Sequence, residues 1–300
     1  MSPWWRRALR IAVAVGVIGL VWRMVDGAEV LARLRAVHPG WIGVALLCLG
    51  VQTLLSALRW RMTAARLGHE IGVARAVREY FLAQVVNLAL PGGVLGDAGR
   101  ALRAGAEAGM ERAGQAVVFD RLAGQAALVL VAMTGAAVVS LVPGGVALPG
   151  GFGAVLLIVG AGIGLVVGVA LWAGRAWPRL AVWRAAAGRA VFAPDAWPWQ
   201  LGLSLGTVGL NLLAFAASAA AVGVWLSPAA IMVILPLVLF AMLLPISIGG
   251  WGLREGAAVA LFPLAGATGA EGFAASACFG VVFLLSALSG LLMFLIPERN

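Results

Sequence analysis

"NLALPGGVLGDAGR" (residues 87–100) interrupts an apolar helical run with a proline and two glycines, and then presents an aspartate and an arginine. "LLPISIGGWGLREG" (residues 243–256) repeats that order, ending on an arginine beside a glutamate. A helix broken inside lipid leaves backbone N–H and C=O groups unpaired unless protein or a water-filled cavity covers them. Both stretches therefore predict half-helices within a membrane domain, whose ends are shielded from lipid by protein or by a water-filled cavity.

The composition also places the chain in a membrane. Of its 300 residues 63% are hydrophobic and 11% charged, with a mean hydropathy of +1.03, whereas soluble domains carry about 25% charged residues. The expected fold class is all-α, a polytopic helical bundle of about six to eight spans of roughly 20 residues each. We expect a single transmembrane domain over residues 1–300, with pseudo-repeat halves at about 1–141 and 152–300 and no soluble domain.

The apolar runs give the expected spans. Candidate spans are residues 8–25, 41–59, 117–141, 152–173, 199–225, 229–246 and 273–296. Two shorter apolar pieces, 79–90 and 255–265, adjoin the broken stretches and are too short to cross a bilayer comfortably. We expect them to be the half-helices.

Arginines set the expected orientation. They flank alternate spans, while the loop 142–151 and the turn 227–228 carry no charge, so the arginine-rich segments are expected to be cytoplasmic. This places the chain in the bacterial cytoplasmic (inner) membrane with a cytoplasmic N-terminus. The loop 26–40 then lies outside and violates the rule, because it carries Arg33 and Arg35. Segment 174–198 fits either a surface helix or a plain loop, and tryptophans near span ends, Trp60 among them, are expected to anchor at the interfaces.

Several charged side chains lie within or beside apolar segments, where they must face a cavity or one another. They are Asp97, Arg100, Asp120, Arg121, Arg254 and Glu255. Arginine binds phosphate through paired hydrogen bonds, and a carboxylate can hold the arginine or meet a cationic headgroup. The alternative is structural, with Asp97–Arg100 and Asp120–Arg121 as ion pairs at the cytoplasmic interface.

The half-helix ends are expected to line the same cavity. Their residues are Pro91, Gly92, Gly93, Gly249 and Gly250. Such ends offer free N–H groups and a positive dipole to an anionic group, and two breaks in comparable halves of a chain point to a substrate site. The helical positions Gln84, Asn87, Gln125, Asn211 and Ser247 are instead expected to form interhelical hydrogen bonds.

Catalytic and metal-binding patterns are missing from the sequence. It contains no HExxH and no phosphate-binding loop, and its two cysteines form no CxxC pair. We expect no enzymatic activity, no cofactor and no metal. The formal net charge is +9, and the arginines that produce it lie between apolar spans. We therefore expect them to orient the chain in the membrane and to contact anionic lipid headgroups rather than nucleic acid.

Four blocks carry a resemblance that covers nearly the whole chain. "LRWRMTAARLG" (58–68), "LPGGVLGDAGRA" (90–101), "VVFDRLAGQ" (117–125) and "LPISIGGWGLREGA" (244–257) resemble, in order and spacing, the flippase-like transmembrane family. This is the membrane region of lysylphosphatidylglycerol synthases, also found as stand-alone proteins, one branch of which is associated with hopanoid biosynthesis. The resemblance implies re-entrant helices from two related halves around a cavity for a lipid headgroup. In bifunctional members this region moves an aminoacylated phospholipid between leaflets.

The resemblance carries over to particular residues. They are Asp97, Arg100, Arg121, Arg254 and Glu255, with Asp120 where the family often has glutamate. The chain ends at Asn300 without an aminoacyl-transferase domain, so its lipid need not be lysylated. The expected function is a lipid flippase for a polar, phosphate-bearing lipid; the alternative is a membrane-embedded partner or enzyme of lipid or glycan assembly.

The expected partners follow from this function. They are membrane lipids, whether anionic phospholipid, aminoacylated phospholipid or another polar lipid, and a separate lipid-modifying enzyme is a further candidate. The small-xxx-small spacing of Gly160, Gly164 and Gly168 permits close helix packing and a homodimer without requiring one.

Overall fold

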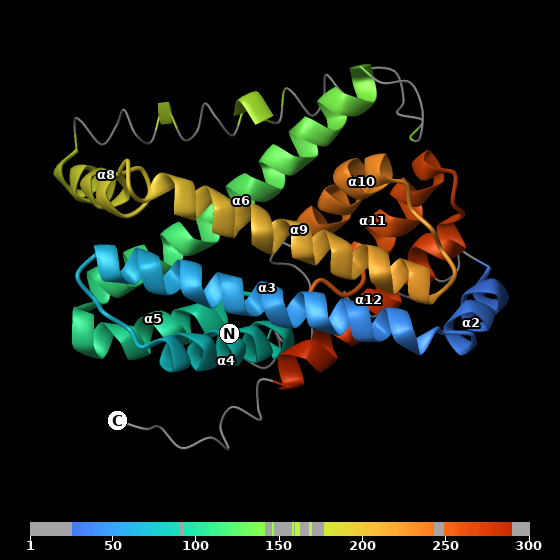
Figure 1. Ribbon diagram of the computed structural model, residues 1–300, viewed down its shortest axis with the longest axis horizontal. Helices are drawn as coiled ribbons and strands as arrows, with labels where there is room; N and C mark the ends of the chain where they lie inside the picture. Colours follow the sequence, from blue (N-terminus) through green and yellow to red (C-terminus); the bar gives the residue numbers. More distant parts are fainter. Residues whose placement is uncertain are drawn as a thin grey trace, which may run out of the picture.

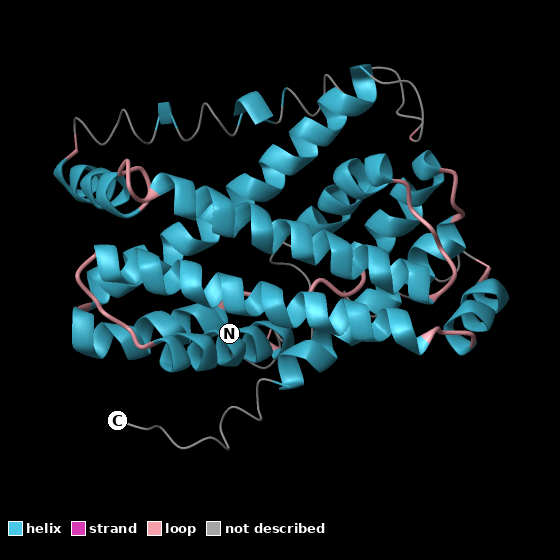
Figure 2. Ribbon diagram, viewed as in Figure 1, coloured by secondary structure: helices cyan, strands magenta, loops and turns pink. Residues whose placement is uncertain are grey.

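The computed structural model describes most of the chain. The described residues are 26–90, 93–141, 146, 158, 160–162, 168–169, 177–242 and 249–289. Within them every regular element is a helix (Figure 2), which confirms the all-α fold class. The predicted span 8–25 and most of 152–173 lie outside the described residues.

Of the helices in the described residues, four are long and apolar enough to cross a membrane. They are α3 (Pro39–Arg66), α6 (Met110–Leu141), α9 (Trp197–Ala221) and α12 (Gly269–Ser289). α3 and α6 cover the predicted spans 41–59 and 117–141. α9 ends at Ala221, before the predicted residue 225, and α12 overlaps the predicted span 273–296, whose last seven residues lie outside the described part. The chain is therefore a multi-pass membrane protein. Helices α3 and α9 run side by side along the long axis, and α6 crosses them obliquely (Figure 1). Proline in the first turn of α3 and α9 favours their starting points, because a first-turn residue needs no backbone N–H.

Helices α4 (Val73–Ala89) and α5 (Leu95–Ala108) form the first re-entrant hairpin, and they pack together in Figure 1. α4 begins earlier than the predicted residue 79, because its first turns bury Ala76 and Val77. The break between the two helices ends at Gly93, whose φ of +62° is in the left-handed region that favours glycine.

Cross-pairs fix the antiparallel order of this hairpin. From its open end to its tip they are Arg75–Glu107 at 2.7 Å, Glu79–Arg103 at 2.6 Å and Asn87–Asp97 at 2.8 Å. Along these pairs the residue number in α4 rises while that in α5 falls. The two helices are therefore antiparallel, and the chain enters along α4 and returns along α5. Gly96 lies directly against the Ala83 carbonyl, where a side chain would collide with the backbone.

Helices α10 (Pro228–Ala241) and α11 (Leu253–Leu261) form the second hairpin and pack together, followed by the 3₁₀ turn η1 (Phe262–Ala265). α10 ends before the predicted residue 246, and residues 243–248 lie outside the described part. Gly249 has a φ of +57°, and a side chain there would approach the Leu88 carbonyl oxygen to 3.2 Å. The two hairpin tips, far apart in sequence, therefore touch.

Two further helices occupy the ends of the molecule (Figure 1). Segment 174–198 contains a helix, α8 (Pro178–Ala190), whose Trp183 packs edge-on against Phe119. The predicted loop 26–40 contains α2 (Gly27–Arg35). Its Arg33 pairs with Glu29 and Glu271, so one of the two arginines that violate the orientation rule is neutralised within the protein.

Candidate functional site

A cavity of about 270 Å³ lies where the two hairpin tips meet the middle of the long helices. Gly93 from the first break and Gly249 from the second both line it, together with residues of α3, α6, α9 and α12. The two sequence breaks therefore open onto one shared space. The non-helical residues Gly93 and Gly249 thus lie beside a cavity, where non-helical backbone inside a membrane is tolerated.

The cavity wall is rich in carboxamides. Its polar lining residues are Gln52, Ser56, Gln84, Asn87, Gln125, Thr207 and Asn211, alongside the charged Arg59, Asp97 and Arg121 and the phenol of Tyr80. Asn211 Oδ1 is buried and has no hydrogen-bond partner among the described residues. An unpaired buried acceptor is costly, so the position suits a ligand that brings a donor.

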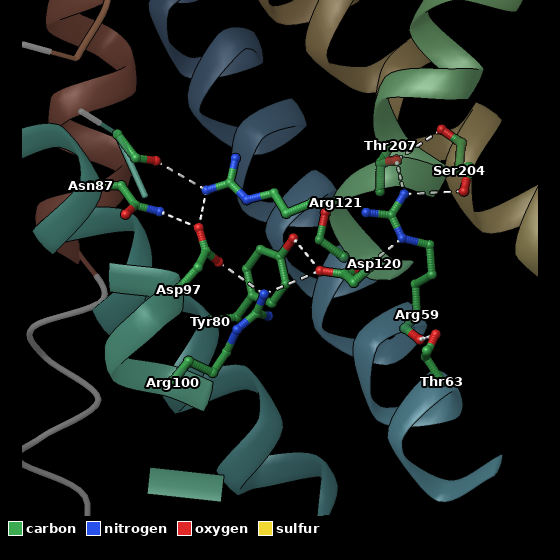
Figure 3. A network of polar contacts seen from close by, with 12 residues as sticks. Arg59, Thr63, Tyr80, Asn87, Asp97, Arg100, Asp120, Arg121, Ser204 and Thr207 are labelled. Carbon is green, nitrogen blue, oxygen red and sulfur yellow. Dashed lines mark hydrogen bonds and ion pairs between the residues drawn. The ribbon is translucent and has the colours of Figure 1, made fainter. Parts of the chain in front are cut away.

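Asp97, in the first turn of α5, gathers three donors beside the first break (Figure 3). Its Oδ1 accepts a hydrogen bond from Arg100 Nη2 at 2.9 Å, and its Oδ2 accepts from Asn87 Nδ2 at 2.8 Å and from Arg121 Nη2. Arg121 also donates to the Gly93 carbonyl at 3.3 Å. One carboxylate thus ties α4, α5 and α6 to the tip of the first hairpin.

Asp120 is a second, fully buried carboxylate, with 0% exposure. It accepts hydrogen bonds from Arg59 Nε at 2.9 Å, Arg100 Nη2 at 3.2 Å and the Tyr80 hydroxyl at 3.2 Å. Arg59 Nη1 in turn donates a hydrogen bond to the Ser204 hydroxyl at 3.1 Å. The network therefore links five helices, α3, α4, α5, α6 and α9, through charged groups (Figure 3).

Arg100 lies between two aromatic rings, with its guanidinium carbon 4.4 Å from the ring centroids of Trp60 and Tyr80. Its Nε and Nη1 have no hydrogen-bond partner among the described residues, so the ring faces provide their favourable contact. The expectation that Trp60 anchors at an interface is wrong, because its side chain is 1% exposed and covers this buried cation.

The cluster has more positive than negative charge. Three guanidiniums, those of Arg59, Arg100 and Arg121, face two carboxylates, Asp97 and Asp120. Only Arg121 is substantially open, with 37% of its side chain exposed against 4% for Arg59 and none for Arg100. The net positive charge is therefore presented to the cavity mainly by Arg121.

Arg254 and Glu255 form a separate ion pair at the start of α11. Each is 1% exposed, and Ser276 joins them by accepting from Arg254 Nε at 2.9 Å and donating to Glu255 at 3.0 Å. Glu255 also accepts from the Gly252 N–H at 2.6 Å, which caps the helix. Gly280 leaves room for the guanidinium, since a side chain there would collide with it. The pair is neutral, its carboxylate is fully engaged, and neither residue lines the cavity.

The structure thus divides the predicted site residues into groups. Asp97, Arg121, Gly93 and Gly249 line the cavity, and Arg100 and Asp120 lie behind it. Gly250 faces Met242 at the second tip. Pro91 and Gly92 lie outside the described residues. Of the two structural pairs considered from sequence, Asp97–Arg100 is present, whereas Asp120 pairs with Arg59 and Arg100 while Arg121 pairs with Asp97.

Sequence reasoning missed part of this site. It treated Arg59 only as an orientation marker, and it did not single out Tyr80, Ser204 or Thr207. The available signal was the position of Arg59 at the last residue of the predicted span 41–59, next to apolar residues of α3, where an unpaired charge is unfavourable. Gln84, Asn87, Gln125 and Asn211, expected as interhelical links, all line the cavity. In the described part of the chain, no group of three His, Cys, Asp or Glu residues could hold a metal ion.

Comparison with known proteins gives one family. Residues 7–290 match the model of the family described as "Lysylphosphatidylglycerol synthase TM region". A search of curated proteins finds no match. The matched range includes both hairpins and every residue of the cavity described above.

Proposed function

The chain belongs to the family of the lysylphosphatidylglycerol synthase transmembrane region, and on that premise we propose that it is a lipid translocator. The family and the apolar helices make it a multi-pass membrane protein related to lipid handling. The proposed activity is movement of a polar, phosphate-bearing lipid between the leaflets of the bacterial inner membrane, with the headgroup passing through the cavity.

The observation that supports this proposal best is the exposed positive charge at the meeting point of the hairpins. Arg121 lines the cavity and belongs to a cluster with one guanidinium more than it has carboxylates. A phosphate accepts paired hydrogen bonds from a guanidinium, and these are strong where water is scarce. The lipid phosphate would therefore compete with Asp97 for the Arg121 N–H groups.

The remaining lining supports a path for a headgroup rather than for a whole lipid. Carboxamides such as Gln84, Gln125 and Asn211 can replace the water that a headgroup loses. The volume, about 270 Å³, is slightly below the roughly 300–1,000 Å³ typical of pockets that hold a whole drug-sized ligand. The acyl chains would stay in the bilayer. The proposal assigns binding and passage to these residues, and no covalent chemistry.

The test is leaflet exchange in reconstituted vesicles. Fluorescent phosphatidylglycerol is placed in both leaflets, a membrane-impermeant quencher is added outside, and the inner-leaflet signal is followed over time. We expect the wild-type chain to expose that signal and Arg121→Ala to lose most of the exchange. Arg66→Ala is the matched control, because Arg66 pairs with the exposed Asp195 far from the cavity.

Three results would count against the proposal. The first is equal exchange by Arg121→Ala and wild type. The second is a loss of lipid exchange in Arg66→Ala as large as the loss in Arg121→Ala. The third is no exchange of any lipid by folded wild-type protein, which would favour the alternative of a membrane partner in lipid or glycan assembly.

A further inference from the structure

We infer that the cavity selects an anionic headgroup with free hydroxyls, a phosphoglycerol type, and rejects a cationic aminoacylated headgroup. This inference rests on the proposed translocation and names its substrate class. The family description mentions a lysylated lipid, whose headgroup carries ammonium groups. Among the described lining residues, no carboxylate is free to pair with such a group.

The first step is the state of the cavity carboxylate. Asp97 is the one carboxylate among the described lining residues. Both of its oxygens are occupied, since it accepts from Arg100, Asn87 and Arg121. An ammonium there would have to compete with these donors, two of them guanidiniums, for carboxylate oxygens that already accept charge-assisted hydrogen bonds.

Among the described residues, no other acid lines the cavity. All 12 acidic residues except Glu298 lie in the described part of the chain, and apart from Asp97 none of those described lines the cavity. The segments 91–92 and 243–248, which complete the two breaks, contain no acid in the sequence. Asp120, the nearest buried carboxylate, is engaged by Arg59, Arg100 and Tyr80.

The second step is the sign of the local charge. A lysyl ammonium entering the cavity would meet Arg121 with Arg59 close behind it, and like charges placed together disfavour binding. A phosphate without an added cation has the opposite sign. The cavity therefore discriminates by repulsion as well as by attraction, which is how binding sites commonly achieve specificity.

The third step is the need for hydroxyl donors. Asn211 Oδ1 is a buried acceptor without a partner, and Gln125 has no hydrogen bond to another described residue although it lines the cavity. A glycerol headgroup brings O–H groups that donate to such oxygens and accept from the amide N–H groups. A phosphate monoester without glycerol offers at most one O–H group, so it can donate to only one of these oxygens. Hydroxyl recognition thus separates a phosphoglycerol from phosphatidic acid.

The experiment compares lipids in the leaflet-exchange assay. The fluorescent lipids are phosphatidylglycerol, lysylphosphatidylglycerol and phosphatidic acid, all labelled on the acyl chain. We expect phosphatidylglycerol to exchange faster than the lysylated lipid by about tenfold or more, as like-charge repulsion predicts. Equal exchange of the two, or faster exchange of the lysylated lipid, would overturn the inference while leaving translocation established.

Two substitutions test the cause of the selectivity. Gln125→Glu adds a carboxylate to the cavity one helical turn from Arg121 and cancels the net positive charge. The ratio of lysylated to unmodified lipid exchange should therefore rise several-fold, whereas the uncharged Gln125→Leu should not raise it. Asn211→Leu should slow phosphatidylglycerol more than phosphatidic acid. An unchanged lysylated-to-unmodified ratio in folded Gln125→Glu, or equal slowing of both lipids in folded Asn211→Leu, would contradict the assigned recognition.

A separate arm distinguishes a lipid from a soluble ligand. Vesicles loaded with radiolabelled glycerol phosphate should retain it, because the inference requires an acylated headgroup. Release of glycerol phosphate without exchange of any lipid would refute the proposed translocation itself, and with it the substrate class.

Discussion

At the scale of single residues, Asp120 and Arg121 are neighbours in the sequence with different environments. Asp120 points into the protein and is 0% exposed, whereas Arg121 lines the cavity with 37% of its side chain open. Buried ions are costly unless paired, and an open guanidinium retains partial solvation. Substitutions at the two positions should therefore affect different properties.

Asp120→Ala should destabilise the fold. Removing this carboxylate leaves Arg59 and Arg100 as buried cations without their shared partner, at a cost of about 3–5 kcal/mol. Thermal unfolding in detergent should show a marked fall in the midpoint. Arg121→Ala should unfold close to wild type, since Asp97 keeps Arg100 and Asn87. A stable Asp120→Ala protein would mean that the network does not hold the helices.

Arg254 and Glu255 offer a test of the structural ion pair. Arg254→Met alone leaves the Glu255 carboxylate buried without its cation, which should cost about 3–5 kcal/mol of stability. Adding Glu255→Gln removes the stranded charge and should restore much of that loss. Unfolding midpoints of the two single variants and the double variant measure the coupling. Additive losses in the double variant would show that the two side chains do not interact.

At the scale of elements, the first hairpin depends on close contact between α4 and α5. Gly96 packs against the Ala83 carbonyl, so Gly96→Ala should push the helices apart and lower both stability and lipid exchange. Gly114→Ala is the matched control on α6, because a side chain there would meet nothing within 4 Å. Unfolding in detergent and exchange in vesicles are the measurements. Wild-type values for Gly96→Ala would show that the hairpin tolerates separation.

The open end of that hairpin should be sensitive to acid. The hydrogen bond from Arg75 lowers the pKa of Glu107 below its usual range. A lowered pKa means that the ion pair stabilises the folded state above the usual pKa of glutamate and that this contribution is lost as the pH falls through the folded-state pKa. The stability difference between wild type and Glu107→Gln should therefore shrink as the solution is acidified from pH 7 to about 3. A difference independent of pH would contradict the pairing.

The elements show how far sequence reasoning reaches. Apolar runs and the two Pro-Gly breaks predicted the long helices and the half-helices, because a bilayer tightly restricts length and backbone pairing. The predicted charges Asp97 and Arg121 do line the cavity. The separation of Arg254 from the cavity could not be foreseen, because both breaks carry the same kind of charged pair. The structure shows that the second pair is closed, because Ser276 on α12 and the Gly252 N–H complete its hydrogen bonds.

At the scale of the whole molecule, α8, which carries Arg184 and Arg189, and α2 lie at opposite ends of the long axis (Figure 1). The positive-inside rule predicts that the first is cytoplasmic. In a chain whose Cys48 and Cys278 are replaced by alanine, Asp195→Cys should react with an impermeant thiol reagent only after spheroplasts are opened. Trp225→Cys, at an exposed position, should react in intact spheroplasts. The opposite pattern would invert the proposed orientation.

The whole account depends on a headgroup entering the cavity between the two hairpin tips. The most direct measurement is crosslinking with a phosphatidylglycerol that carries a photoreactive group on its glycerol, followed by mass spectrometry of the labelled peptides. We predict labels at Gln84, Gln125 and Asn211, which line the cavity from three different helices, and loss of these labels in Arg121→Ala. Labels confined to the membrane-facing surface, or centred on Arg254, would contradict the account.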